Sequence, residues 1–388
     1  NSAVVRFVGE ELASENRRGA RHVLWLCYRL ALGTTLVTAA VVCGGICLAG
    51  DHFLELTDFA RIALMTACTL SLQGFCNLSA AALRGMGEMR YSSILGGQGG
   101  VVGPFANSLF LVLVVAAAAC TRLTLESTLV LYVASFAVVL TIGSIWVWRT
   151  AATVFAEPTA TDSAALLTAT TLLTACLPMM LVQILSVFAK QGALWVAGAT
   201  CTPQELALYA GANRAIQLVG IPLSFVNLSV MGFIPQLRMQ GRLADLERVL
   251  RIAAGWAAIP SFLALVLFLC APGPVLELFL GEKYRDAALL LSILSFGQFA
   301  LVWVGCSETT LVLSGHARSA AVINIVSSST ILVGGYFVAS SLGITALAIL
   351  AAAVLTGQCI AQWLLARQLV GVWTHAAAKP WRLMQRMR

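Results

Sequence analysis

The feature that most constrains this chain is a series of apolar segments, each long enough to cross a lipid bilayer. Ten segments can be read between short polar breaks, at residues 24–49, 60–83, 93–119, 127–148, 165–189, 205–234, 252–270, 288–313, 319–339 and 344–366. A helix of about 20 apolar residues crosses the hydrocarbon core. Lipid offers backbone N–H and C=O groups no partner, so each segment is expected to be helical. The sequence predicts an all-α polytopic membrane protein.

The composition argues against a soluble enzyme. Hydrophobic residues make up 59% of the chain and charged residues 11%, whereas soluble domains carry about 25% charged residues. The eleven cysteines and four histidines show no spacing typical of a metal site, and no Ser/His/Asp or Cys/His grouping can be built from them. We therefore expect no enzymatic activity, no cofactor and no bound metal.

The stretch "GGQGGVVGP" at residues 96–104 is the densest glycine cluster. A phosphate-binding loop would require a preceding strand, a following helix and a nearby lysine, and this apolar context provides none of them. Gly96 and Gly100, like Gly99 and Gly103, form small-xxx-small pairs that let neighbouring helices approach closely. Pro104 marks a point where a helix can kink. We interpret these five residues as packing or hinge residues.

Lysines and arginines gather at one set of segment ends. Residues 1–22, 84–91, 149–163, 236–251, 314–319 and 367–388 contain seventeen of them, and the opposite ends contain five. Cytoplasmic loops of membrane proteins carry this excess, so both chain ends are expected to be cytoplasmic. The stretch 235–251 is interpreted as one amphipathic helix at that surface. The C-terminal "KPWRLMQRMR" is expected to lie on anionic lipid rather than to bind nucleic acid.

The two halves of the sequence look related. Sliding the sequence along itself places "GEMRYSS" (87–93) over "GHARSAA" (315–321), and at nearly the same shift the basic stretches before residues 24 and 252 align. Repeated halves are typical of transporters whose substrate site lies between them. We expect an N-terminal bundle at 1–155, a C-terminal six-helix bundle at 156–366 and a basic tail at 367–388. The first half holds four spans, so an initial helical hairpin is expected to be absent, giving ten of twelve spans.

Several stretches resemble the polysaccharide-flippase (Wzx-like) branch of the MATE/MOP transporter superfamily. They are "TPQELALYAGANRAIQLVGIPLSFVNLSV", "PQLRMQGRLADLERVLRIA", "LFLGEKYRDAALLLSILSFGQFA" and "LVLSGHARSAAVINIV", with "VRFVGEELA" and "SAAALRGMGEMRYSSIL" in the first half. The resemblance implies two helical bundles around a central cavity and alternating access. It also implies transfer of lipid-linked sugars from the cytoplasmic to the outer leaflet. The chain departs from the family at Ala193, where many relatives carry an acid.

Charged and amide side chains inside the spans are the candidate substrate contacts, because such groups are costly in lipid and tend to face a polar path. Arg214, flanked by Asn213 and Gln217, suits a phosphate because a guanidinium can bind two oxygens at once. A purely structural ion pair is the alternative for Arg214. Lys190 is either a second cationic site or a side chain that reaches the outer interface.

Glu308 is the only carboxylate well within a predicted span. It is a candidate coupling group for a proton or cation, with a structural partner for an arginine as the alternative. Asn77 and Asn324 are candidate cavity residues, although amides within spans more often join helices to one another.

Three functions remain open at this point. The leading hypothesis is a flippase for an undecaprenyl-pyrophosphate-linked oligosaccharide in a bacterial cytoplasmic membrane. Its candidate partners are membrane lipids and the enzymes of polysaccharide assembly, which are glycosyltransferases or a polysaccharide polymerase. A cation-coupled multidrug exporter would require carboxylates in the first bundle, where no deep one is found. A non-transporting scaffold for polysaccharide assembly is the third.

Overall fold

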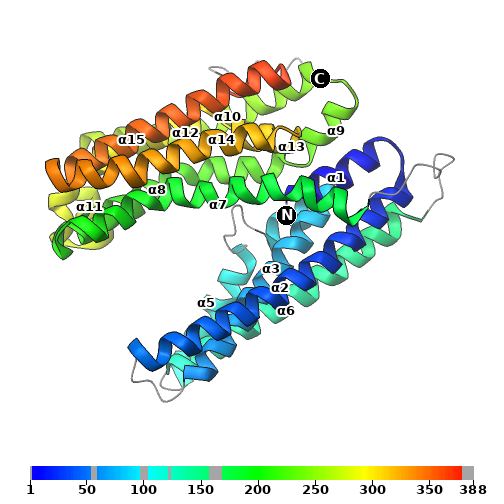
Figure 1. Cartoon of the computed structure of the whole chain (residues 1–388), viewed down its shortest axis with the longest axis horizontal. Helices are drawn as coiled ribbons and strands as arrows, with labels where there is room; N and C mark the ends of the chain where they lie inside the picture. Colours follow the sequence, from blue (N-terminus) through cyan, green and yellow to red (C-terminus); the bar gives the residue numbers. More distant parts are fainter. Residues whose placement is uncertain (1, 54–58, 97–103, 121–123, 157–167, 378–388) are drawn as a thin grey trace. The chain divides into compact units, whose positions relative to one another are not determined.

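The computed structural model describes residues 2–53, 59–96, 104–120, 124–156 and 168–377. Every regular element in these ranges is helical, which confirms the predicted fold class. The chain divides into two compact units, Asn1–Leu172 and Leu173–Arg388 (Figure 1). This division lies at residue 172, later than the boundary expected near residue 155. Within the predicted tail, residues 367–370 belong to α15, and the residues after 377 lie outside the described ranges.

Unit 1 contains six helices in its described ranges. They are α1 (Ser2–Ala13), α2 (Arg17–Phe53), α3 (Phe59–Gly85), α4 (Met89–Leu95), α5 (Pro104–Cys120) and α6 (Leu125–Val154). The centre of the unit is the C-terminal half of α3, which packs against α1, α2 and α6. Ala80, Ala81, Ala82 and Leu83 are fully buried there. Three successive alanines let the neighbouring helices lie close to α3, as small residues do in membrane bundles.

Unit 2 is built around α12, which packs against α8, α10 and α15. Its elements are α7 (Ala169–Thr200), α8 (Pro203–Val230), α9 (Phe233–Met239), α10 (Leu243–Cys270), α11 (Pro272–Leu280), the 3₁₀ helix η1 (Glu282–Ala287), α12 (Ala288–Val304), α13 (Ser307–Leu313), α14 (Ala317–Ser329), the π-helical turn η2 (Thr330–Gly334) and α15 (Gly335–Val370). At Gly297 a methyl group would lie 3.0 Å from the Ala352 backbone, so glycine permits the close contact of α12 with α15.

Six helices in the described ranges are long and apolar enough to cross a membrane, or seven if α8 and α9 form one bent span. The longest helical stretch, Ala317–Val370, contains two of the predicted segments, and Gly343 (φ 78°) separates them. Each of the ten predicted segments contains helical structure within its described residues.

Four predicted continuous helices are interrupted, and one is longer than expected. Segment 93–119 leaves helical structure after Leu95, segment 205–234 bends between α8 and α9, and two further segments break at a glycine. The segment 288–313 breaks between α12 and α13 at Gly305, and the amphipathic segment 235–251 breaks at Gly241, where φ is 70°. Helix α7 continues to Thr200, so Lys190 lies inside a helix and does not end one. Backbone with positive φ explains both breaks at glycine, because glycine adopts it without steric cost.

The turns that join helices support the internal repeat at atomic detail. The amide N–H groups of Met86, Gly87 and Glu88 donate to the carbonyls of Ala82, Arg84 and Leu83, and residues 314–316 repeat the pattern. Gly87 and Gly315 occupy the same place in the two turns, with φ of 89° and 87°. This is the left-handed residue that ends many helices.

A second pair of turns recurs at a slightly smaller shift. The amides of Ser14, Glu15 and Asn16 donate to the carbonyls of Glu10, Leu12 and Glu11, and residues 240–242 repeat the pattern. The left-handed position is Glu15 (φ 60°) in the first turn and Gly241 in the second. The shift that places Glu15 over Gly241 is two residues smaller than the shift that places Gly87 over Gly315. The turn, and not the charge pattern, therefore sets the alignment of the two basic stretches.

The segment after α15, residues 371–377, packs against the arginine-rich end of unit 2. The Trp373 N–H donates to Glu247 of α10 (3.2 Å), and the buried Thr374 hydroxyl donates to the Val304 carbonyl of α12 (2.9 Å). His375 lies within 5.5–5.7 Å, ring centre to ring centre, of Trp303, Trp363 and Trp373. We call residues 371–377 the C-terminal clamp, since they join α10, α12 and α15.

Acidic pH is expected to loosen this clamp. Burial of the ring is the main cause that lowers the pKa of His375 below 6.5. The nearby Arg251 guanidinium lowers it further, and the Glu247 carboxylate opposes the shift. Arg367, over the Trp373 ring, is a further charge beside the clamp. The docked clamp thus favours neutral histidine. The contribution of neutral His375 to the stability of the docked clamp is fully present above pH 6.5. This contribution is lost as the pH drops below 6.5 toward the lower pKa of the docked ring.

Hydrogen–deuterium exchange at residues 371–377, corrected for intrinsic rates at pH 7.5 and 5.5, checks this prediction. We expect faster exchange at pH 5.5 in the native chain and no pH effect in His375→Gln, which stays neutral. Equal pH dependence in both proteins would show that another group titrates.

Candidate transport site

A network of amides in unit 2 surrounds the side chain of Asn324. Its Oδ1 accepts hydrogen bonds from Gln358 and Gln362, both at 2.9 Å, and its Nδ2 donates to the Val182 carbonyl at 3.3 Å. Gln362 donates its other amide proton to Glu308 Oε2 at 3.0 Å. Asn324 is fully buried, and the two glutamines are nearly so. We call Glu308, Asn324, Gln358 and Gln362 the amide network.

Four helices position these groups. The break at Gly305 starts the short helix α13, which places Glu308 in its first turn, where the helix dipole favours a negative charge. Gln358 and Gln362 are four residues apart on α15 and therefore share a face. Helix α7 joins α14 through its backbone carbonyls, because Ser328 donates to the Leu185 carbonyl (2.9 Å) as Asn324 does to that of Val182.

The network gives Glu308 a defined partner. Within the described ranges its carboxylate accepts a hydrogen bond from Gln362 and forms no ion pair with an arginine. The side chain is half-buried. Glu308 is therefore a partly accessible carboxylate held by an amide inside an apolar bundle, and its coupling role stays a prediction.

Lys190 lies on the exposed side of α7. Ala193, close to Lys190 on the same helix, is buried. The structure brings Asn324 and Glu308 together through Gln362, and α7 reaches this network through the Val182 carbonyl.

Arg214 and Gln217 are exposed on α8, and Asn213 is half-exposed beside them. The opposite face of α8, including Ala212, Ala215 and Val219, is buried against the rest of unit 2. No hydrogen bond or ion pair of Arg214 is recorded with any described residue, which disagrees with a structural ion pair there. Arg214 is not part of the amide network.

The remaining candidates lie in unit 1. Asn77 is buried in α3. Gly99, Gly100 and Gly103 fall at residues 97–103, outside the described ranges. Gly96 was expected within a spanning helix, but α4 ends at Leu95 and Gly96 is extended (φ −122°, ψ 143°). Pro104 was expected to kink a helix, but it is the first residue of α5, a position that suits proline because no helical N–H is needed.

Gly96 is nevertheless a close-contact position. A methyl group there would lie 2.4 Å from the Ala80 side chain and 3.0 Å from the Arg84 guanidinium. Arg84 is buried, and its Nε donates to Ser92 Oγ (2.7 Å), which donates to the Ala80 carbonyl (2.8 Å). At the shift that places Gly87 over Gly315, Ala80 and Gly96 correspond to Glu308 and Asn324. Unit 1 therefore has close packing where unit 2 has the amide network.

Sequence reasoning missed Gln362 and Arg84. The spacing of Gln358 and Gln362, four residues apart in an apolar segment, was a signal for a shared polar face. Arg84 had been counted only as a loop charge, and nothing in its local sequence distinguishes a buried arginine from an exposed one.

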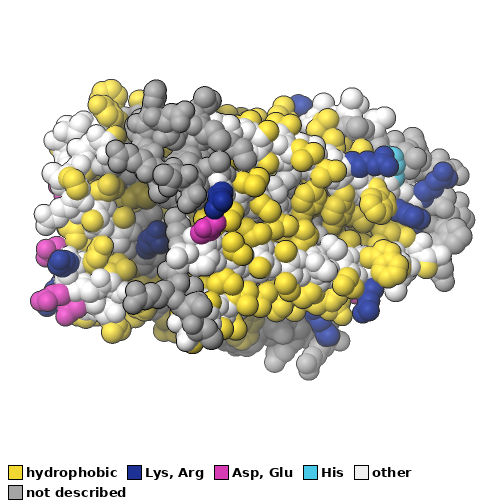
Figure 2. Space-filling view, turned by 90° about the horizontal axis from the view of Figure 1, so that it is seen from below, with side chains coloured by type: hydrophobic (Ala, Val, Ile, Leu, Met, Phe, Trp, Pro, Cys, Tyr) yellow, Lys and Arg dark blue, Asp and Glu magenta, His cyan; other side chains and the backbone are white. Residues whose placement is uncertain are grey.

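The molecular surface is largely apolar. Figure 2 shows a broad hydrophobic face, with charged side chains gathered mainly toward its ends. Large side chains such as Leu263, Phe337 and Leu342 are at least 65% exposed. Such a surface suits lipid, which agrees with a multi-pass membrane protein.

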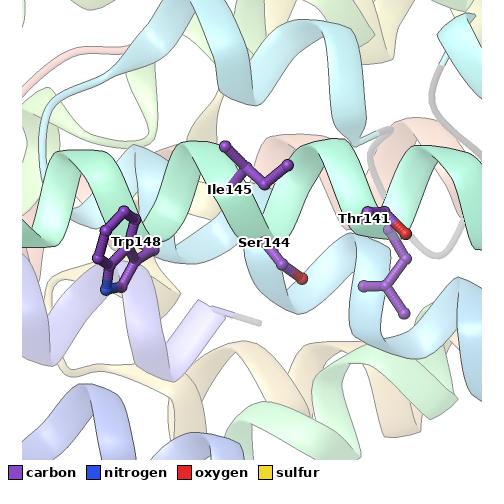
Figure 3. Close-up of a pocket in the computed structure, with 5 residues that line it drawn as sticks. Thr141, Ser144, Ile145 and Trp148 are labelled. Atoms are coloured by element: carbon purple, nitrogen blue, oxygen red, sulfur yellow. The ribbon is translucent and has the colours of Figure 1, made fainter.

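An open hollow of about 480 Å³ lies along α6 in unit 1. It is lined by Leu140, Thr141, Ser144, Ile145 and Trp148, which Figure 3 draws along the helix. All five residues come from one helix, so the hollow is a shallow surface feature and not an enclosed binding site.

Comparison with known proteins places this geometry in a recognised fold. Residues 178–337, from α7 to the start of α15, match the MatE family model. A MATE structure in the bent conformation superposes with a TM-score of 0.75 at 15% identity, over 99% of this chain and 84% of the other. The chain has the MATE transporter fold.

Two further MATE-fold structures show the same likeness. An outward-facing multidrug resistance MATE family transporter of the MOP superfamily gives a TM-score of 0.70 at 15% identity, over 99% of this chain and 83% of that one. A MOP superfamily transporter from Pyrococcus furiosus, whose binding pocket has reversed polarity, gives 0.73 at 15% identity, over 95% and 83%. No curated protein sequence matches this chain.

These matches bear directly on two of the expectations. The matched solved structures are described as transporters, and the prediction that this protein is not an enzyme agrees with that fold. The match to the MATE/MOP superfamily is supported, and the polysaccharide-flippase branch stays a proposal. The MatE match includes Glu308 and Asn324 but ends before Gln358 and Gln362.

Proposed function

We propose that this protein is a MATE-fold membrane transporter that moves a lipid-linked oligosaccharide, carried on undecaprenyl pyrophosphate, across a bacterial cytoplasmic membrane. Both ends of the chain would be cytoplasmic, in accordance with the bias of lysine and arginine. Glycosyltransferases and a polysaccharide polymerase are the partners that such a substrate would require.

The observation that carries this proposal is the exposed Arg214 in the middle of α8. A charged side chain facing hydrocarbon is costly, so an arginine without a recorded partner among the described residues is expected to face a polar path. The substrate carries a pyrophosphate, which a guanidinium can bind through two parallel hydrogen bonds. Asn213 and Gln217 lie close enough on α8 to contact sugar hydroxyls or phosphate oxygens.

Energy coupling is assigned to Glu308 within the amide network. Protonation, or binding of a cation, would change the charge next to Gln362, and Gln362 joins α15 to Asn324 on α14. A change at Glu308 therefore reaches two helices and, through Val182, a third. Lys190 supplies a cation on α7, the helix that reaches the network through the Val182 carbonyl.

A cation-coupled multidrug exporter is the second candidate. It is favoured by Glu308, since a carboxylate suits both a coupling ion and a cationic drug, and by the likeness to a multidrug resistance transporter. In the described part of unit 1, the carboxylates lie in α1, at helix ends or in turns. This placement argues against the exporter, which would require carboxylates deep in the first bundle.

Reconstituted full-length protein separates these functions. We would measure transbilayer movement of a labelled undecaprenyl-pyrophosphate oligosaccharide in proteoliposomes, with and without a proton or sodium gradient. Arg214→Gln is expected to lower the initial rate roughly tenfold or more, because a charge-assisted hydrogen bond is worth about 1.5–3 kcal/mol. Arg318→Gln, a matched change at an exposed arginine, is expected to leave the rate unchanged.

Glu308→Gln is expected to remove the effect of the gradient while slow, gradient-independent movement continues. Unchanged movement in Arg214→Gln would keep the flippase but exclude Arg214 as its site. No movement in any protein, together with gradient-driven export of a cationic dye, would establish the exporter. Absence of both activities would favour a non-transporting scaffold.

A further inference from the structure

An apolar groove of about 240 Å³ lies where α8 bends by 45° into α9. Both helices pack against α10 in unit 2. The groove is lined by the end of α8, the start of α9 and one face of α10, chiefly by Phe225, Val226, Val230, Phe233, Val249 and Ala253. The bend between the two helices separates their side chains and so opens the groove.

The groove exposes aromatic side chains that are expected to be covered. The side chain of Phe225 is 57% exposed and that of Phe233 is 44% exposed. The only polar side chain in the lining is that of Ser229, and its hydroxyl already donates to the Phe225 carbonyl. The lining therefore suits a hydrocarbon chain and offers almost nothing to a polar ligand.

A positively charged cluster lies at one end of the groove, at the start of α10. Arg242 and Arg248 both pair with Asp245, at 2.9 Å and 3.3 Å. Asp245 precedes Val249 by four residues and so continues the groove-lining face of α10, and Arg242, which pairs with Asp245, directly precedes the helix. Two guanidinium groups share one carboxylate, which leaves a net positive charge. These side chains are 36–59% exposed, so an anion can reach them.

We propose that this groove and cluster bind an anionic phospholipid. One acyl chain lies against Phe225, Phe233 and Val249, and the phosphate lies at Arg242 and Arg248. The complementarity is of two kinds, since the apolar groove fits the chain and the net positive charge fits the phosphate. The site lies at the arginine-rich end of unit 2, and it does not depend on which substrate the protein transports.

Binding of phosphatidylglycerol to the purified full-length protein in detergent tests this site. Native mass spectrometry gives the apparent Kd, and phosphatidylcholine with the same acyl chains is the neutral control. Val249→Trp, which fills the groove, is expected to weaken phosphatidylglycerol binding roughly tenfold, because the lipid loses its chain contacts. Leu263→Trp is the matched control on the same helix, at a 65% exposed position outside the groove, and is expected to bind as the native protein does.

Two further variants distinguish loss of the site from loss of the fold. Phe225→Ala removes an exposed wall of the groove, and the double variant Arg242→Gln/Arg248→Gln removes the charge. Both are expected to weaken phosphatidylglycerol binding while thermal unfolding stays at the native midpoint. Equal affinity for the two lipids, or native affinity in Val249→Trp, would overturn the proposal. Competition by glycerol phosphate as strong as by the whole lipid would do so too, since it would indicate a free-phosphate site.

Discussion

Replacing Gly305 with alanine is expected to destabilise unit 2 by about 2–5 kcal/mol, through backbone strain and overpacking together. Gly305 has φ of 78°, and an added methyl group would lie 2.5 Å from the Thr374 carbonyl oxygen and 2.8 Å from the Ala254 side chain. The first neighbour is backbone of the C-terminal clamp and cannot rotate away. We therefore expect both a lower midpoint of thermal unfolding and release of the clamp.

Gly343→Ala is the matched control for this substitution. Gly343 also has φ of 78°, but an added methyl group would meet no atom within 4 Å. Its cost is therefore the conformational penalty alone, about 1–2 kcal/mol. Denaturation of both variants in mixed micelles measures the difference. Equal losses of stability would show that the contact with Thr374 contributes nothing and that strain explains the whole effect.

Replacing Asn324 with leucine is expected to cost about 2–4 kcal/mol, because buried groups lose their hydrogen bonds without regaining water. The amides of Gln358 and Gln362 would lose the shared Oδ1 acceptor, and the Val182 carbonyl would lose the side-chain donor. Gln362 also holds Glu308, so the variant is expected to disturb gradient-dependent transport as well as stability.

Asn107→Leu provides the control for Asn324→Leu. Asn107 is exposed on α5, so the same change there should be neutral in thermal unfolding. A neutral effect of Asn324→Leu would mean that the amide network is not a stabilising contact between α7, α14 and α15. Retention of gradient dependence in a destabilised Asn324→Leu would separate the structural role of the network from coupling through Glu308.

The fold class and the repeat could be read from the sequence for a physical reason. Lipid requires every spanning backbone to satisfy its own hydrogen bonds, so an apolar segment of sufficient length becomes a helix whatever it packs against. The repeat was visible because its marker is a glycine that the turn itself needs. Gly87 and Gly315 end their helices in the same left-handed conformation, and this requirement is local.

The breaks inside the predicted helices were not visible in the same way. Gly96 and Gly305 stand in apolar sequence like many glycines that remain helical. Close tertiary contacts do not separate them either, because Gly211 and Gly220 have neighbours as close as those of Gly96 and Gly305 and remain helical in α8. Sequence therefore located the glycines, and only the backbone conformation in the structure shows which of them interrupt a helix.

For the candidate site, too, the sequence identified some residues and the tertiary structure decided their partners. Sequence alone identified Arg214, Lys190 and Glu308, because a charge in an apolar segment is conspicuous wherever it lies. It could not assign their partners, since hydrogen bonds between helices join residues such as Glu308 and Gln362 that are far apart in the chain. The tertiary structure linked Glu308 to an amide instead of an arginine and left Arg214 exposed on α8. Helix formation is set by the residues of each segment and the lipid around it, whereas the amide network exists only where four helices meet.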